Sequence, residues 1–227
     1  MRALATAQFG SATLFKTEPE LNIKNAGVRA FALGTLLAAA IQPSLAQEPD
    51  KTARIRGTVA SLSGDQLVVK THDGKSIPLT LAKDWAVTGI KKAEMSDIKP
   101  GDYVGIASLP KSEGGDGALE VLIFPPSMKG TGEGHYDWDL KPNSSMTNGT
   151  VGDAVKSVEG STVTVTYQGK EKKIAIPAST PIVTFAPAVA ADVKPGAAVF
   201  VSTKVDAAGK MTAGRVVVGN NGVVPPM

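Results

Sequence analysis

Apolar and polar residues alternate along the first well-patterned part of the chain, from Ile55 to Leu81, which reads IRGTVASLSGDQLVVKTHDGKSIPLTL. Alternation with a period of two residues is typical of β-strands that bury one face. Gly64-Asp65 and Asp73-Gly74 interrupt the pattern, and such dipeptides are typical of tight hairpin turns. The pattern therefore predicts three short strands, beginning at Arg54 and joined by two hairpins.

A less regular stretch follows, AKDWAVTGIKKAEMSDIKPG, before two more apolar runs. Lys91 to Ile98 is predicted to form a turn or two of helix that Pro100-Gly101 ends. Trp85 and Met95 flank this segment, and we expect them to plug a barrel end. Strands four and five are then DYVGIASLP and ALEVLIF, separated by the Gly-rich KSEGGDG.

The same plan occurs a second time, about 95 residues later along the chain. Gly149-Thr150-Val151 matches Gly57-Thr58-Val59, and ADVKPG matches SDIKPG at the same place in the order of elements. Proline fixes its own φ and glycine allows a sharp reversal, so Lys-Pro-Gly ends one element and starts the next. Five strands and a turn kept in order favour an internal duplication over chance alternation.

Three strands, a short connection and two strands within about 70 residues is the order of a five-stranded OB-like barrel. We therefore predict an all-β fold with two tandem small five-stranded OB-like β-barrels. The predicted segments are a signal peptide with an N-terminal extension (1–46), a flexible lead-in (47–53), the first barrel (54–125), an aromatic-bearing linker (126–147), the second barrel (148–220) and a tail (221–227).

The predicted leader lies in KNAGVRAFALGTLLAAAIQPSLA, residues 24–46. Two basic residues precede an apolar run of about 12 residues and a small-residue end at Ser44 and Ala46, the order found in secretory signal peptides. The run is shorter than the roughly 20 residues of a spanning helix. We expect cleavage after Ala46, a periplasmic or secreted product and no stable membrane span in it; the alternative is an uncleaved anchor at residues 30–46.

Charge and cysteine content narrow the classes of function. Without residues 1–46, which hold four basic and two acidic residues, the chain keeps 20 Lys and Arg against 19 Asp and Glu. A near-neutral protein with 5% aromatic residues lacks the basic patches and stacking rings that bind nucleic acid. The chain has no cysteine, so disulfides, thiolate nucleophiles and thiolate metal sites are excluded.

The segments GTVASLSGDQLVVKTH and AEMSDIKPGDYV resemble the small periplasmic OB-fold metallochaperone domains of copper and silver efflux systems. The resemblance covers about 70 residues and implies an OB-like barrel. Family members bind a soft monovalent metal through a His at the end of strand two and a Trp and two Met on the next strand. Only His72 matches here, because the next strand is KSIPLTL and the equivalent place in the second copy is near Tyr167 or Gln168.

The duplicated pattern also resembles exported bacterial proteins of unknown function built from tandem OB-like β-barrel repeats. This second resemblance supports the fold and implies no chemistry. Thioether ligands decide Cu(I) affinity, and they are missing from the positions that match the metallochaperone domain.

The sharpest group of candidate ligands lies between the two copies, in EGHYDWDL. In an extended strand Glu133, His135, Asp137 and Asp139 project to one face, and Tyr136, Trp138 and Leu140 project to the other. Imidazole with carboxylate suits Zn(II) or Mn(II). Met128, His135, Trp138 and Met146 are the alternative set for Cu(I). The competing interpretation is that Tyr136 and Trp138 fasten the linker in the groove between the barrels while the acidic face is solvated.

The sequence assembles no nucleophile, base and oxyanion hole by spacing, so we expect no enzyme and no catalytic residue. The favoured interpretation is a noncatalytic, exported binding or structural module of the bacterial envelope, whose ligand is unknown. The alternative is a periplasmic metal-binding accessory protein related to metal transport or efflux, with Zn or Cu as its ion. A third class is a partner of an envelope protein that binds by strand addition.

Overall fold

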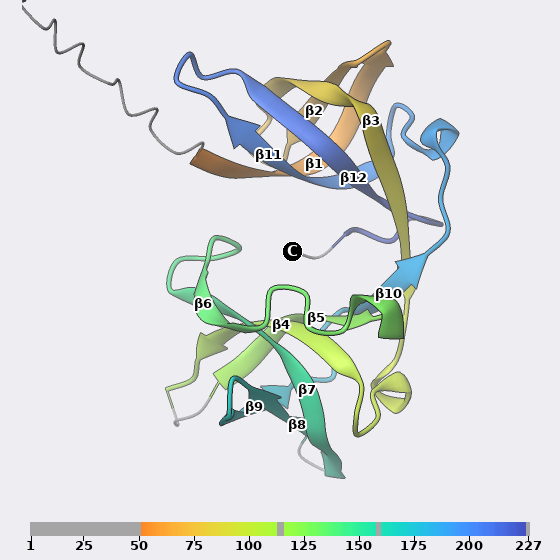
Figure 1. Ribbon diagram of the computed structural model, residues 1–227. Helices are drawn as coiled ribbons and strands as arrows, with labels where there is room; N and C mark the ends of the chain where they lie inside the picture. Colours follow the sequence, from red (N-terminus) through yellow and green to blue (C-terminus); the bar gives the residue numbers. More distant parts are fainter. Residues whose placement is uncertain (1–50, 113–115, 158–159, 226–227) are drawn as a thin grey trace, which may run out of the picture. The chain divides into compact units, whose positions relative to one another are not determined.

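The computed structural model describes residues 51–112, 116–157 and 160–225 (Figure 1). The predicted signal peptide and the start of the lead-in lie outside these residues. Strands and three short 3-10 helices make up the regular structure of the described part, and no α-helix occurs in it. The strands are β1 (Lys51–Ser63), β2 (Gln66–Thr71), β3 (Ser76–Lys92), β4 (Tyr103–Pro110), β5 (Asp116–Phe124), β6 (Gly134–Trp138), β7 (Ser144–Ser157), β8 (Gly160–Tyr167), β9 (Lys170–Ile176), β10 (Ile182–Ala186), β11 (Ala198–Val205) and β12 (Met211–Gly219).

Five strands from the two ends of the described chain form a closed barrel, which we call the terminal barrel. Its strands pair in the order β1, β2, β3, β12, β11 and back to β1. Alternating side chains of these strands point inward, as the period of two predicts. The buried core consists of Ile55, Val59, Leu67, Val69, Leu79, Leu81, Val193, Val199, Val201, Ala213, Val216 and Val218.

The strands from the middle of the chain pair in a second ring, which we call the central ring. The order is β4, β5, β9, β8, β7 and back to β4. Its last contact, between β5 and β9, consists of two residue pairs, Asp116 with Ile174 and Gly117 with Ala175. The core of this ring is Ala93, Ile98, Val104, Ile106, Ala118, Val121, Ile123, Val151, Val163, Val165, Ile174, Ile176 and Ile182.

The coarse prediction, an all-β chain with a closed five-stranded barrel, is confirmed. Two tandem barrels at 54–125 and 148–220 are not: β1 to β3 pair with β11 and β12, while β4 and β5 pair with β7 and β9 (Figure 1). The physical reason is the length of β3. Its last residues pair with β12 on one side and with β10 on the other, so the chain leaves the terminal barrel before β4 begins.

The pairing registers repeat between the two groups of strands. Gly57 pairs with Val199 in the terminal barrel, and Gly149 pairs with Val104 in the central ring. Both glycines allow a close backbone approach, since a Cβ at Gly57 would lie 2.1 Å from the Lys70 carbonyl oxygen and one at Gly149 would lie 2.5 Å from that of Thr166. The parallel pairs match in the same way: Val87 of β3 pairs with Val216 of β12, and Ile182 of β10 pairs with Val121 of β5.

The predicted helix at Lys91 to Ile98 is shorter in the structure, because β3 continues through Lys92. A 3-10 helix, η1 (Met95–Asp97), precedes the first Lys-Pro-Gly turn, and its counterpart η3 (Ala190–Asp192) precedes the second. Both turns place glycine at positive φ, as expected. Trp85 packs against the terminal-barrel core and Met95 against the core of the central ring.

Candidate functional site

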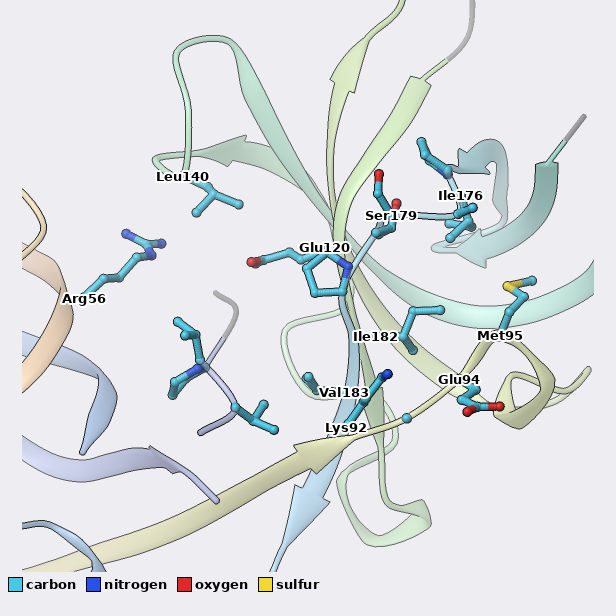
Figure 2. A pocket seen from close by; sticks show the side chains of 18 of the residues that line it. Arg56, Lys92, Glu94, Met95, Glu120, Leu140, Ile176, Ser179, Ile182 and Val183 are labelled. Atoms are coloured by element: carbon cyan, nitrogen blue, oxygen red, sulfur yellow. The ribbon is translucent and has the colours of Figure 1, made fainter. Parts of the chain in front are cut away.

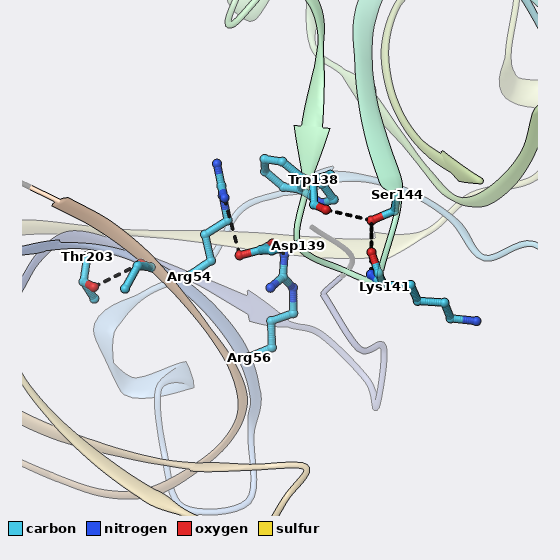
Figure 3. Close-up of polar contacts among 8 residues, drawn as sticks. Arg54, Arg56, Trp138, Asp139, Lys141, Ser144 and Thr203 are labelled. Carbon is cyan, nitrogen blue, oxygen red and sulfur yellow. Dashed lines mark hydrogen bonds and ion pairs between the residues drawn. The ribbon is translucent and has the colours of Figure 1, made fainter. Parts of the chain in front are cut away.

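The predicted linker is a hairpin of the central ring. Its strand β6 pairs with the first residues of β7, from Gly134 opposite Asn148 to Trp138 opposite Ser144. The Ser144 hydroxyl lies 2.9 Å from the Trp138 carbonyl oxygen and 2.7 Å from that of Lys141, which fixes the connection (Figure 3). The strand β7 therefore begins at Ser144, before the predicted start of the second copy at residue 148.

The end of this hairpin contacts β1 of the terminal barrel (Figure 3). The Arg54 guanidinium lies 3.9 Å from the centre of the Trp138 ring, and Arg56 forms a 2.7 Å ion pair with Asp139. Burial raises the pKa of Asp139, but the hydrogen bond from Arg56 and the charges of both arginines outweigh it, so the pKa falls below its usual value. We call Arg54, Arg56, Trp138 and Asp139 the clamp.

Two of the other predicted ligands on this segment have partners within the central ring. A Glu133 carboxylate oxygen accepts a hydrogen bond from the Gln168 backbone N–H at 2.8 Å. The His135 ring lies 6.0 Å from that of Tyr167, centroid to centroid. The acidic face of the segment is therefore engaged in specific contacts at Glu133 and Asp139 rather than only solvated.

A polar cavity of about 460 Å³ lies beside His135 and Asp137. The Lys172 ammonium stands between Asp116 Oδ2, at 2.6 Å, and His135 Nε2, at 3.3 Å. An ammonium can only donate, so Nε2 accepts and Nδ1–H donates to the Thr147 hydroxyl, 2.9 Å away. Burial and then the Lys172 charge lower the pKa of His135, against the opposing effect of Asp116 and Asp137. The imidazole is therefore neutral near pH 7.

This geometry bears on the predicted metal site. Within residues 51–112, 116–157 and 160–225, no three His, Asp or Glu side chains are placed to share one ion. Lys172 occupies the place between Asp116 and His135 that a cation would take. Of the soft set, Met146 is buried on β7, where it pairs with Tyr136 of β6. His72 lies exposed in the turn after β2. Zinc or copper binding stays a prediction.

A larger cavity, of about 840 Å³, was not predicted from the sequence (Figure 2). Residues of β1, the end of β3, β5, the segment between β9 and β10, and the chain end line it. Ile182, Val183, Val199, Val223 and several prolines form apolar walls. Ser179 and Thr180 bring hydroxyl groups to the lining.

Glu120 lines this cavity from the middle of β5 (Figure 2). It is 5% exposed, and its neighbours Val121 and Ile123 face the core of the central ring. The alternation of β5 turns Glu120 and Leu122 to the opposite face, where Leu122 packs with Ile90 and Val183. One signal was available in the sequence, since Glu120 is the single charged residue in ALEVLIF.

Comparison of the chain with models of known families, with curated proteins and with solved structures finds no match. In the part of the chain that the structure describes, no helix has the length and apolar character needed to cross a bilayer.

Proposed function

We propose that this protein is a noncatalytic, exported binding module that holds a small, largely apolar ligand in the 840 Å³ cavity. The observation that carries the proposal is the cavity itself. Ligand pockets are usually about 300–1,000 Å³, with apolar walls and a few placed polar groups. Binding requires only the shape and charge of this lining, so the proposed role includes no chemical step.

The position of the cavity in the fold supports this role. Its lining joins Arg56 and Val199 of the terminal barrel to Glu120 and Ile176 of the central ring. A third apolar cluster joins Phe200 and Val217 of the terminal barrel to Leu122 of the central ring, and it includes Val183 of the cavity lining. A ligand here would contact both groups of strands at once, as is common for sites between packed substructures.

The test is a titration of the purified chain with the neutral fluorescent probe N-phenyl-1-naphthylamine. We expect saturable enhancement of probe fluorescence. Ser179→Trp, an exposed position on the lining, should fill part of the cavity and weaken binding about tenfold, the effect of about 1.4 kcal/mol. The matched control is Ser63→Trp, an exposed serine outside the lining. Equal binding by both variants, or no saturable binding, contradicts the proposal.

Export is the second part of the proposal, and it rests on the leader pattern of residues 24–46. Expression of the full chain in a Gram-negative host should deliver a periplasmic product whose first residue is Gln47. N-terminal sequencing of that fraction tests both cleavage and its position. A cytoplasmic product that retains residues 1–46 would contradict export.

We further propose that the two groups of strands arose by duplication with exchange of the last two strands of each copy. The matching registers of Gly57 with Val199 and Gly149 with Val104 support this proposal. It preserves the sequence repeat while explaining why β11 and β12 complete the terminal barrel. Repeat units that complete one another in this way resemble a domain-swapped dimer joined into one chain.

A further inference from the structure

The clamp and the large cavity lie between the same two groups of strands. We propose that the clamp is a reversible latch: when it separates, the terminal barrel and the central ring open about the end of β3, and a ligand enters or leaves the cavity. Entry of a ligand rests on the proposed function, because it concerns the same cavity. Opening of the clamp can be measured without a ligand.

The hairpin that carries the clamp is also part of the cavity wall. Leu140 lines the cavity directly after Asp139 of the clamp, and Arg56 both lines the cavity and pairs with Asp139 at 2.7 Å. Figure 2 shows Leu140 and Arg56 at one side of the cavity and Met95, which follows β3, at the other. Separation of Asp139 from the terminal barrel would therefore move one wall of the cavity.

On another side, paired strands and a buried apolar cluster join the two groups. The last residues of β3 pair with β12 of the terminal barrel and with β10, which in turn pairs with β5 of the central ring. The cluster on these strands and on β11 consists of Ile90, Leu122, Val183, Phe200 and Val217. Exposure of such side chains to water is unfavourable, so this junction should stay closed and act as the hinge.

The clamp is held by contacts that separate more easily. The Asp139 side chain is 46% exposed, so water and salt screen its ion pairs with Arg54 and Arg56, at 3.4 and 2.7 Å. The Arg54 guanidinium over the Trp138 ring adds a contact that contributes little where water reaches it. The clamp should therefore open before the hinge does, and ionic strength should change how often it opens.

The distance between two spin labels tests the opening. The chain has no cysteine, so Thr52→Cys on β1 and Lys141→Cys in the turn after β6, both exposed, place one label on each side of the clamp. Double electron-electron resonance should show a longer distance whose share grows between about 0.1 M and about 1 M sodium chloride, as the Debye length falls from about 10 Å to about 3 Å. Asp139→Asn should show the longer distance already at the lower concentration.

Two further variants sharpen this measurement. Trp138→Ala removes a contact of the clamp without a change of charge and should also lengthen the distance. Asp153→Asn removes an exposed carboxylate of β7 outside the clamp, so it is the matched control for Asp139→Asn and should leave the distance unchanged. Near-ultraviolet circular dichroism verifies the fold of each variant.

The rates of probe binding test whether the latch controls access to the cavity. Stopped-flow fluorescence follows both the association and the dissociation of N-phenyl-1-naphthylamine. The contribution of an exposed ion pair corresponds to a factor of about two to five, so Asp139→Asn should raise both rate constants by about that factor and leave the equilibrium affinity nearly unchanged. Asp153→Asn should change neither rate constant.

The outcomes separate this inference from the proposed function. Label distances that respond neither to salt nor to Asp139→Asn overturn the latch, whatever the probe shows. Saturable probe binding with the same rate constants in Asp139→Asn and the unaltered chain overturns the control of ligand entry while leaving the cavity as a binding site. Equal effects of Asp153→Asn and Asp139→Asn assign the response to net charge and also overturn the inference. Absence of saturable probe binding contradicts the proposed function, and the label distances then decide whether the clamp opens.

Discussion

The terminal barrel and the central ring use matching strands, but they close differently. The parallel seam between β3 and β12 contains seven residue pairs, whereas β5 meets β9 in two pairs and β10 in three. The 17-residue β3 runs along this seam as one strand, although its pairs with β12 skip residues 82–85. In the central ring the equivalent path ends at Ile176 and resumes at Ile182. Both parallel seams skip a few residues, and they differ in whether one strand continues across the skipped residues.

Two prolines account for the break of the strand between β9 and β10. Pro177 and Pro181 stand 95 positions after Ala82 and Ala86, which lie inside β3. Proline has no N–H to donate to the ladder, so a strand interior disfavours it. The Pro181 carbonyl oxygen still accepts the Val121 N–H at 3.0 Å, so the segment stays beside β5. The break also supplies residues 177–181 to the lining of the large cavity.

The largest expected effect comes from removing β11 and β12. A chain that ends after Gly196 should lose the terminal barrel, because β1 and β3 would each lack a partner strand. Hydrogen exchange at the amide of Val69, on β2, measures this loss. Two tandem barrels would predict the opposite, a Val69 amide that stays protected in the truncated chain.

Alanine substitutions at equivalent core positions should lower the free energy of unfolding by different amounts. Leu81 and Ile176 are 2% and 3% exposed and stand 95 positions apart, inside the continuous strand β3 and at the last residue of β9. Large-to-alanine changes in a core cost about 2–5 kcal/mol, less where the surroundings relax. We expect about 4 kcal/mol for Leu81→Ala and about 2 kcal/mol for Ile176→Ala. Urea denaturation measures both, and equal costs would contradict the idea of a looser seam.

The ion pair of Lys172 with Asp116 joins β9 to β5 at the weakest contact of the central ring. Their side chains are 23% and 12% exposed, so Lys172→Ala leaves a largely buried carboxylate. We expect the free energy of unfolding to fall by about 1–3 kcal/mol, with Lys173→Ala, exposed on the same strand, as the control.

Thermal unfolding in the presence of zinc then tests the predicted metal site. Zinc should stabilise the Lys172→Ala variant. If zinc stabilises neither that variant nor the unaltered protein, the prediction of a metal site is wrong.

The four residues of the clamp should contribute least to the free energy of unfolding. Trp138→Ala removes the ring that Arg54 covers, at a cost of about 1 kcal/mol. Asp139→Asn should cost below about 1 kcal/mol, because Asp139 is 46% exposed and water screens its ion pairs. A double-mutant cycle with Arg54→Ala isolates the Trp138 contact. Full additivity would show that this contact does not stabilise the fold.

The candidate sites contain some features that neighbouring residues determine and others that depend on residues far apart in the sequence. Alternation in EGHYDWDL indicated an extended segment, and the competing interpretation gave Tyr136 and Trp138 a fastening role; the structure has a strand there and the Arg54 guanidinium over the Trp138 ring. Alternation missed Lys172, which lies 37 residues after His135 and stands at its Nε2. It also missed the large cavity, because its lining residues come together only when distant strands pair.

The sequence by itself determined the strands, the two Lys-Pro-Gly turns and the inward faces of Val, Ile and Leu. These features follow from alternation and from the φ preferences of glycine and proline, which act over a few residues. Tertiary structure alone decided which strands complete each ring, because β4 and β11 carry similar apolar patterns and either suits the same partner. The last residues of β3 pair with β10 beyond the terminal barrel, and β4 therefore begins in the central ring. No local sequence pattern determines this arrangement.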